Sequence, residues 1–309
     1  MDDITHALAG TLLAQAHPSK RKGLILACVA GALVPDIDIV LTLWGRHLYL
    51  TEHRGFTHSL LGVIPMSLFA AGIAWAWVRK KKDPASFGML WLFALTGVIS
   101  HILLDWCTSW GTMILWPNRT RFALDYLFII DLWYASCLAM PLLAGLYWKE
   151  YRVKISLAGL ALVLAYHGLT AFNHQRALGL VRMNEPQVWK AAFPLPFSPF
   201  RWSIFGRADG VLDQKRVDLL KADPILGSSE WKAPFLTPEL QQVMDSPQGK
   251  KYLWFARVPV WEEEEQKDGT SVIRFWDMRF QNYLDNGQAQ KRFGTVFQVK
   301  EGHVTGGDF

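Results

Sequence analysis

The residues best suited to chemistry are histidines and aspartates that lie at the ends of apolar segments. His101 and Asp105 are four residues apart, so a helix would place an imidazole and a carboxylate on one face, about one turn apart. Asp36 and Asp38 follow Pro35 at the end of another apolar segment, where two carboxylates can chelate or bridge a hard divalent cation. These pairs suit ligands of one metal ion or of adjacent ions.

A further pair of imidazoles lies on a predicted turn. His53 and His58 flank Arg-Gly-Phe-Thr, in which Gly55 permits the turn and Arg54 is available for an anionic substrate. Imidazole and carboxylate donors without a thiolate favour zinc, with manganese or iron as alternatives. With a histidine near the start of the chain, the predicted ligands of this divalent metal are His6, Asp36, Asp38, His53, His58, His101 and Asp105.

Each motif alone also has a structural interpretation. His101 and Asp105 could form a buried hydrogen-bonded pair, and His6 could cap or pack a helix. The two aspartates after Pro35 could simply cap a turn. We expect Asp131 to hydrogen-bond within the helices. The convergence of four histidines and three aspartates from four segments favours a metal site, because ionisable groups near apolar spans are costly unless they pair or bind a metal.

Apolar segments must position these residues. Four are about long enough to cross a hydrocarbon core of roughly 30 Å as helices: 60–78, 89–104, 127–148 and 155–172. Two earlier segments, 4–16 and 23–35, are shorter and predict a hairpin of two short or partly inserted helices. The predicted fold is therefore an α-helical membrane bundle with about four full spans plus an N-terminal short-helix hairpin, followed by a small β-rich soluble domain.

Basic residues orient the predicted spans. Lysines and arginines collect in short cytoplasmic loops, and here they occur at 20–22, 79–82 and 149–154. These runs fall at every second connection, so one alternating topology places all of them inside. The N-terminus, the connections 44–59 and 107–126 and everything after residue 172 would then face outward. This topology brings the histidines and aspartates together at the extracytoplasmic face.

Composition divides the 309 residues into two predicted domains, a membrane-embedded helical metal-site domain at 1–175 and a β-rich extracytoplasmic domain at 176–309. After a proline-rich stretch, strand-like patterns at 201–207, 252–260, 271–280 and 291–299 predict a small antiparallel sheet. Asp268-Gly269 predicts a hairpin turn, reached across an acidic loop at 262–265. We expect that loop to be solvated rather than to bind a cation.

The net charge of +5 and the pI near 9.0 could suggest nucleic-acid binding. The basic residues cluster beside apolar segments, however, so we expect the lipid bilayer as the partner and no nucleic acid. Cys28, Cys107 and Cys137 show no zinc-finger spacing and no even count, so no disulfide framework is implied. The N-terminus lacks the basic region of a cleavable signal peptide. The sequence does not address the oligomeric state.

Four motifs, in this order and spacing, resemble the YdjM-type family of LexA-regulated, inner-membrane-associated proteins assigned as metal-dependent hydrolases. They are Thr5-His6, Pro35-Asp-Ile-Asp38, His53-Arg-Gly-Phe-Thr-His-Ser59 and His101-Ile-Leu-Leu-Asp105. The resemblance covers roughly residues 1–175 and implies a multi-pass protein of the bacterial inner membrane. It extends more distantly to zinc-dependent phospholipase C and helical zinc nucleases, from which this chain departs because it lacks their N-terminal tryptophan and its helices look membrane-embedded. Pro199-Phe-Arg-Trp202 and Asp277-Met-Arg-Phe280 resemble segments of longer family members.

We expect a membrane-bound hydrolase that cleaves a phosphoester or related bond of a lipid-linked or phosphorylated substrate with metal-activated water. Arg54 would clamp an anionic group, and an aspartate that does not ligate, Asp38 first, would act as general base. One alternative is a metal-ion transporter, against which the one-sided clustering of ligands and the lack of an internal repeat both count. Another is a non-catalytic membrane scaffold in which the polar cluster stabilises the helices.

Overall fold

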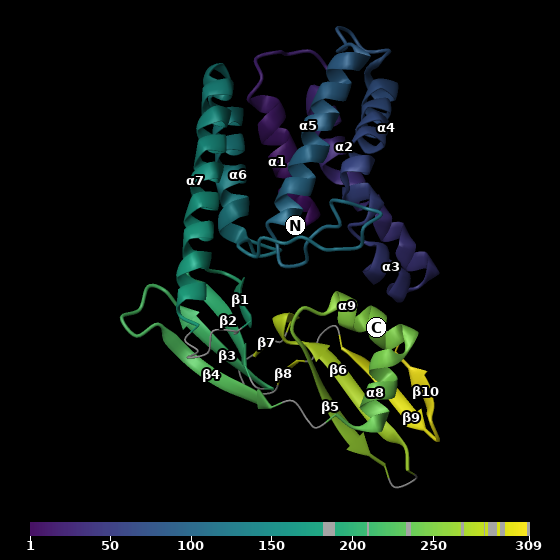
Figure 1. Cartoon of the computed structure of the whole chain (residues 1–309). Coiled ribbons are helices and arrows are strands. Elements are labelled where there is room, and N and C mark those ends of the chain that lie inside the picture. The colour runs from purple at the N-terminus through teal and green to yellow at the C-terminus, as the bar shows by residue number, and fades with distance from the viewer. Residues whose placement is uncertain are drawn as a thin grey trace.

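The chain folds into a helical bundle and a β-rich domain joined at one end of the bundle (Figure 1). The computed structural model describes residues 1–181, 189–208, 210–232, 236–266, 269–280, 282–283, 289–290 and 294–307. Apolar helices make up the first half and two antiparallel four-stranded sheets dominate the second. The predicted fold class is therefore confirmed.

The bundle consists of apolar helices and short 3-10 segments. In chain order these are α1 (Asp3–Gln15), α2 (Leu24–Leu33), η1 (Val34–Trp44), α3 (Arg46–Glu52), η2 (Phe56–His58), α4 (Leu60–Val78), α5 (Phe87–Trp106), α6 (Leu132–Tyr147), η3 (Lys149–Tyr151) and α7 (Arg152–Gly179). Small residues let α2 and α5 approach closely, because a Cβ at Gly31 or Gly97 would overlap the facing backbone. This approach brings the α2 backbone within reach of side chains on α5.

Four helical segments are long and apolar enough to cross a membrane: Leu24–Trp44, Leu60–Val78, Phe87–Trp106 and Lys149–Gly179. The first was expected to be a short helix ending near residue 35. It is longer because α2 continues into η1, with Pro35 in the first turn of η1, where its missing N–H costs little. The predicted span at 127–148 is shorter than expected. Its helix starts only after Asp131, whose side chain caps α6.

The three basic connections lie together at the end of the bundle away from the sheets (Figure 1). Lys22 pairs with Pro84 in an isolated bridge, which joins the α1–α2 and α4–α5 connections. Arg152, at the start of α7, donates a hydrogen bond of 3.4 Å to the carbonyl of His17. The α7 helix itself continues to Gly179, beyond the predicted end of the span at residue 172.

The described part of the second half contains two four-stranded antiparallel sheets and a two-stranded one, β7 (Asn282–Tyr283) with β8 (Ala289–Gln290), rather than the single small sheet that was predicted. The first has the order β1 (Trp189–Pro194), β2 (Arg201–Ala208), β3 (Val211–Asp218), β4 (Ile225–Lys232). The second has the order β10 (His303–Gly306), β9 (Thr295–Lys300), β6 (Ser271–Asp277), β5 (Pro259–Glu265). The remaining elements are α8 (Pro238–Asp245), α9 (Pro247–Phe255) and η4 (Met278–Phe280).

The predicted strands at 201–207 and 271–280 correspond to β2 and to β6 with η4. The strand predicted at 252–260 was wrong over its first half, because Ser246 caps α9 and places Tyr252 and Phe255 on its buried face. The acidic segment predicted as a loop instead forms β5, where Glu264 accepts from Arg274 at 2.9 Å. The predicted turn of the hairpin is confirmed, with Gly269 at φ +77°, but the first strand is β5 and not the expected segment 253–261. Asp268 and residues 291–293 lie outside the described residues.

Two arginines of the β-rich domain hold the loop that follows α5. Arg257 forms a bidentate ion pair with Asp125, with N–O distances of 2.5 and 2.7 Å. Arg279 donates to the carbonyl of Ser109 at 2.6 Å and pairs with the buried Asp277 at 2.7 Å. The Asp277-Met-Arg-Phe280 motif therefore fixes the β-rich domain against the loop after α5.

Candidate metal centre

Four donor atoms from three elements face one point near the end of the bundle that joins the β-rich domain. They are Asp36 Oδ1 from η1, His58 Nε2 from η2, and His101 Nε2 and Asp105 Oδ2 from α5. Five of their six separations are 3.0 Å for His58–His101, 3.2 Å for His58–Asp105, 3.3 Å for His58–Asp36, 3.4 Å for His101–Asp105 and 3.6 Å for His101–Asp36, and the sixth, between Asp36 and Asp105, is within 4.8 Å. A tetrahedral ion with bonds of about 2.0–2.1 Å needs ligand atoms about 3.3 Å apart. The arrangement therefore fits one tetrahedral ion.

The Nδ1 hydrogen bonds of the two imidazoles orient both Nε2 atoms, which lie 3.0 Å from each other, toward that point. His101 Nδ1 lies 2.6 Å from the carbonyl of Ala32, so this nitrogen carries the proton and donates it. His58 Nδ1 lies 2.9 Å from Thr57 Oγ1, and that hydroxyl donates to Asp38 Oδ2 at 3.0 Å. His58 Nδ1 is therefore the donor to Thr57. Both Nε2 lone pairs then face the same point, which is the arrangement of metal-binding histidines.

Asp105 has one carboxylate oxygen surrounded by positive charge and one that lacks a hydrogen bond. Its Oδ1 is contacted by the α-amino group of Met1 and lies 2.9 Å from Arg54 Nη2 and 3.3 Å from His6 Nε2. Its Oδ2 is buried and has no hydrogen-bond partner among the described residues, although two imidazole nitrogens face it. A buried unsatisfied oxygen is costly. A cation at the shared point would satisfy it.

A second group of donors shares Asp36 with the first. Asp36, Asp38 and His53 each offer a ligand atom within 4.8 Å of the others. Asp38 is more heavily engaged than a free general base would be. Its Oδ1 lies 2.8 Å from His53 Nδ1, and its Oδ2 accepts from the backbone N–H of Arg54 and from Thr57, both at 3.0 Å. Asp38 therefore holds the turn that carries both His53 and His58.

His6 joins the cluster from its edge. Its ring stacks on that of His101 with a centroid distance of 3.7 Å, and its Nε2 approaches the Oδ1 of Asp105 rather than the shared point. The structure thus brings all seven predicted ligands into one region, with four of them around a single point. Asp131 stays within the bundle, as expected, where it caps α6 and accepts from Tyr166 at 2.9 Å.

Arg54 pairs with a carboxylate of the cluster and also lines a cavity in which a ligand could contact it. Its backbone has φ +63°, and its side chain is almost fully buried. Nη2 pairs with Asp105 and Nη1 donates to Thr108 Oγ1 at 3.0 Å. Arg54 also lines a cavity beside the cluster. Its role as a clamp for an anionic group stays a prediction.

Sequence reasoning missed several residues that support the site. Thr57 lies inside the predicted histidine motif, so that motif could have revealed it. Asp3 lies three residues before His6, and its pKa is raised by burial and by the neighbouring carboxylate of Asp36. Arg121 has no sequence signal. Its guanidinium donates to the carbonyl of His53 at 3.0 Å, and burial lowers its pKa to about 9, with the charge of Arg54 acting in the same direction.

The electrostatics around His53 favour a neutral imidazole. Burial lowers the pKa of His53, although the carboxylate of Asp38 opposes that effect. Neutral imidazole is the form that binds metals and accepts protons. His53 therefore suits either role at neutral pH.

A cavity of about 770 Å³ joins the polar cluster to the outer surface of the bundle. Its polar side includes the acidic Asp2, Asp3 and Asp36 as well as His53 and Arg54. Its apolar side includes Phe69 and Ile73 of α4, whose exposed fractions are 49% and 43%. The cavity therefore connects candidate reactive groups with a surface that would face lipid.

Comparisons with known proteins cover the part of the chain that contains this cluster. The family model for the YdjM inner membrane protein matches residues 1–177. The uncharacterized protein YfhP of Bacillus subtilis is 29% identical over 158 residues, which are 44% of this chain and 47% of that protein. The inner membrane protein YdjM of Escherichia coli is 37% identical over 112 residues, covering 33% and 52% of the two chains.

The inner membrane protein YbcI of Escherichia coli is 33% identical over 119 residues, covering 37% of this chain and 66% of that protein. The chain thus spans about half the length of the first two curated relatives it matches. No solved structure matches the chain.

Proposed function

The chain belongs to the YdjM inner membrane protein family, and on that premise we propose that it is a membrane-bound metal-dependent hydrolase of a phosphoester in a lipid-linked substrate. The observation that carries the proposal is the tetrahedral arrangement around His58 and His101, completed by two carboxylates. Zinc suits this donor set best, with manganese or iron as alternatives. Because the four protein donors fill a tetrahedron, Lewis-acid chemistry requires a fifth ligand position on the ion; a divalent ion held there would then polarise a phosphoryl oxygen or lower the pKa of a water.

The residues beside the four donors suit proton transfer and anion binding. His53 Nδ1 lies 2.8 Å from Asp38 Oδ1, which leaves the Nε2 of His53 as a proton acceptor at the wall of the cavity. Asp38 would then act through His53 as a positioning residue. Arg54 lies on the same wall and would meet the negative charge of the substrate.

The shape of the cavity supports a lipid-linked substrate. Its polar side carries the candidate reactive groups, and its apolar side ends at half-exposed residues on α4. An amphiphile could place its phosphoester among Asp36, His53 and Arg54 while its chain stays in contact with the bilayer. A small soluble substrate would gain no binding energy from the apolar wall.

The test is hydrolysis of two probes by the detergent-purified protein loaded with zinc or manganese. The probes are soluble bis(p-nitrophenyl) phosphate and a phosphatidylglycerol with a fluorescent acyl chain. We expect both activities to disappear with EDTA. In Ile73→Trp the ratio of lipid to soluble-probe hydrolysis should fall at least about tenfold, because the larger side chain narrows the apolar wall.

The control is Ile99→Trp on α5, whose side chain has the same exposed fraction of 43% as Ile73. It should leave the ratio unchanged. Equal ratios in both variants would contradict the cavity as the path of the lipid chain. Failure of the wild type to cleave either probe would contradict phosphoester hydrolysis itself.

We also propose that the metal centre and the β-rich domain face the extracytoplasmic side. The basic connections gather at the opposite end of the bundle, and such loops stay in the cytoplasm (Figure 1). In intact spheroplasts, an impermeant maleimide should label Ser228→Cys on β4 and should label Lys81→Cys only after permeabilisation. Both positions are exposed. The reverse labelling pattern would invert the topology.

A further inference from the structure

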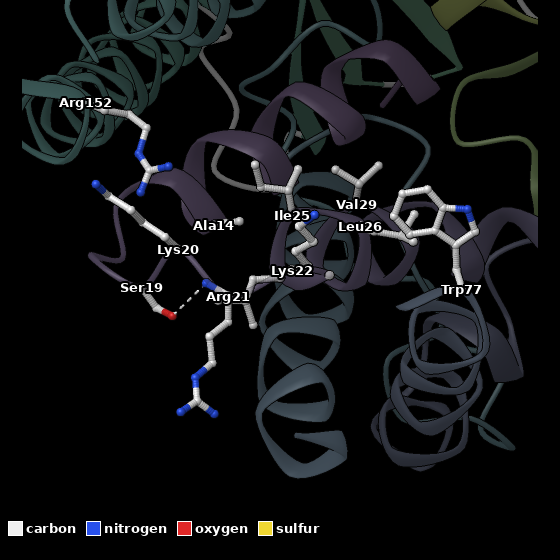
Figure 2. Close-up of a pocket in the computed structure, with 12 residues that line it drawn as sticks. Ala14, Ser19, Lys20, Arg21, Lys22, Ile25, Leu26, Val29, Trp77 and Arg152 are labelled. Carbon is white, nitrogen blue, oxygen red and sulfur yellow. Dashed lines mark hydrogen bonds between the residues drawn. The ribbon is translucent and has the colours of Figure 1, made fainter. Parts of the chain in front are cut away.

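A second cavity, of about 510 Å³ (Figure 2), lies at the basic end of the bundle, which is the end away from the sheets (Figure 1). The connection between α1 and α2 contributes Ser19, Lys20, Arg21 and Lys22 to its wall. Arg152 at the start of α7 faces it from one side, and Trp77 near the end of α4 closes the other side. Segments far apart in the sequence therefore build one cavity.

The charged side chains that line this cavity are all basic. Lys20, Arg21, Lys22 and Arg152 line it, and its lining includes no acidic side chain. In the part of the chain that the structure describes, none of these four cations forms an ion pair with a carboxylate. A neighbouring cavity shares Lys20 and Arg152 and adds Lys149 and Glu150, so the surroundings remain net basic. Such a cluster attracts anions.

The backbone adds donors to this charge. Helix α2 begins after Gly23, which has φ +101°, and no side chain caps its first turn. Leu24, Ile25 and Leu26 of that turn line the cavity. Their N–H groups have no partner within the helix, and the helix dipole favours an anion at this end.

The remaining wall is apolar and reaches the outside of the bundle. Ile25, Leu26, Val29 and Trp77 form it, and Trp77 is 61% exposed. Tryptophan is enriched where a membrane meets water. A free phosphate would contact the basic side chains but not this apolar wall, whereas a phospholipid would contact both.

We propose that this cavity binds the headgroup of an anionic phospholipid, with an acyl chain lying along Ile25, Val29 and Trp77. Basic residues that only set the membrane topology need to lie near the membrane but need not line a common cavity. Here they converge from two connections on one cavity that has an apolar exit, which is how basic pockets between helices bind acidic headgroups. The proposal concerns a different site from the metal centre and does not depend on hydrolysis.

The test measures binding of fluorescent phosphatidylglycerol and phosphatidylcholine to the full chain in detergent, where insertion topology plays no part. Wild type should prefer phosphatidylglycerol. The double variant Lys20→Gln, Arg152→Gln should bind it at least about tenfold more weakly, because two cations of the cavity are lost. The control Lys80→Gln, Lys82→Gln removes the same charge at the same end from side chains outside the cavity lining, and should stay within about twofold of wild type.

Three outcomes would overturn the proposal. One is equal weakening in both double variants, which would indicate general attraction to the basic end. Another is equal affinity of wild type for the two lipids. The third is displacement by soluble glycerol phosphate at the concentration at which phosphatidylglycerol displaces the probe, which would make the ligand a free phosphate. Trp77→Ala provides a second variant, expected to weaken phosphatidylglycerol binding and leave glycerol phosphate binding unchanged.

Discussion

Protein purified in detergent should carry at least one tightly bound divalent ion per chain, and His58→Ala should reduce that metal content at least about tenfold. His58 Nε2 lies 3.0–3.3 Å from each of the other three donor atoms, so its removal opens the tetrahedron. Three donors would remain, with a buried carboxylate oxygen still lacking a partner. Elemental analysis after exhaustive dialysis measures the change directly.

Three further variants separate residues that bind the ion from residues that only support the site. Thr57→Val keeps all four donors but removes the acceptor of the His58 Nδ1 proton, so metal affinity should fall about 10- to 100-fold while saturating zinc restores full occupancy. His17→Ala, at the other end of the bundle, should change nothing. If a second ion is present, His53→Ala should lose that ion and retain the first.

Equal, near-zero metal in wild type and His58→Ala, even after reconstitution with zinc, manganese or iron, would contradict the site. The polar cluster would then serve to hold the helices together. The non-catalytic scaffold would become the better interpretation, and the search for phosphoester hydrolysis would lose its basis.

The sequence was informative where periodicity and residue chemistry coincide. The i, i+4 spacing of His101 and Asp105 requires one helix face, and the structure has their side chains 3.4 Å apart on α5. Positive runs at alternate connections likewise predicted their common end of the bundle. These features depend on local geometry, so they need no knowledge of tertiary contacts.

Other features depend on contacts between distant segments, and the sequence could not reveal them. The acceptor of His101 is the backbone carbonyl of Ala32, whose position follows from the close packing of α2 and α5. The ion pair of Asp125 with Arg257 of the β-rich domain likewise joins residues more than 100 positions apart. The segment that ends at Phe255 has a strand-like composition. It nevertheless forms helix α9, because Ser246 caps the first turn and Pro247 occupies its first position.

Arg54→Ala should destabilise the metal-free protein by about 2 kcal/mol or more, because it removes the guanidinium partner of the buried Asp105 carboxylate and leaves the α-amino group of Met1 as its remaining close cation. The two side chains are 2.9 Å apart and almost fully buried, so their ion pair is screened much less than one at the surface. Arg119→Ala is the matched control. Its pair with Glu52 at 2.6 Å is largely exposed, and its loss should cost less than about 1 kcal/mol.

Thermal unfolding in detergent, with EDTA or with zinc, separates the two roles of Arg54. A bound ion compensates the other oxygen of Asp105 and binds only the folded state, so zinc should recover part of the stability lost in Arg54→Ala. If Arg54→Ala unfolds in EDTA at the same temperature as the wild type but has lost hydrolysis, the structural role is contradicted and Arg54 acts as a substrate clamp. Loss of stability that zinc partly restores would instead show that this arginine balances the charge of Asp105 while the ion is absent.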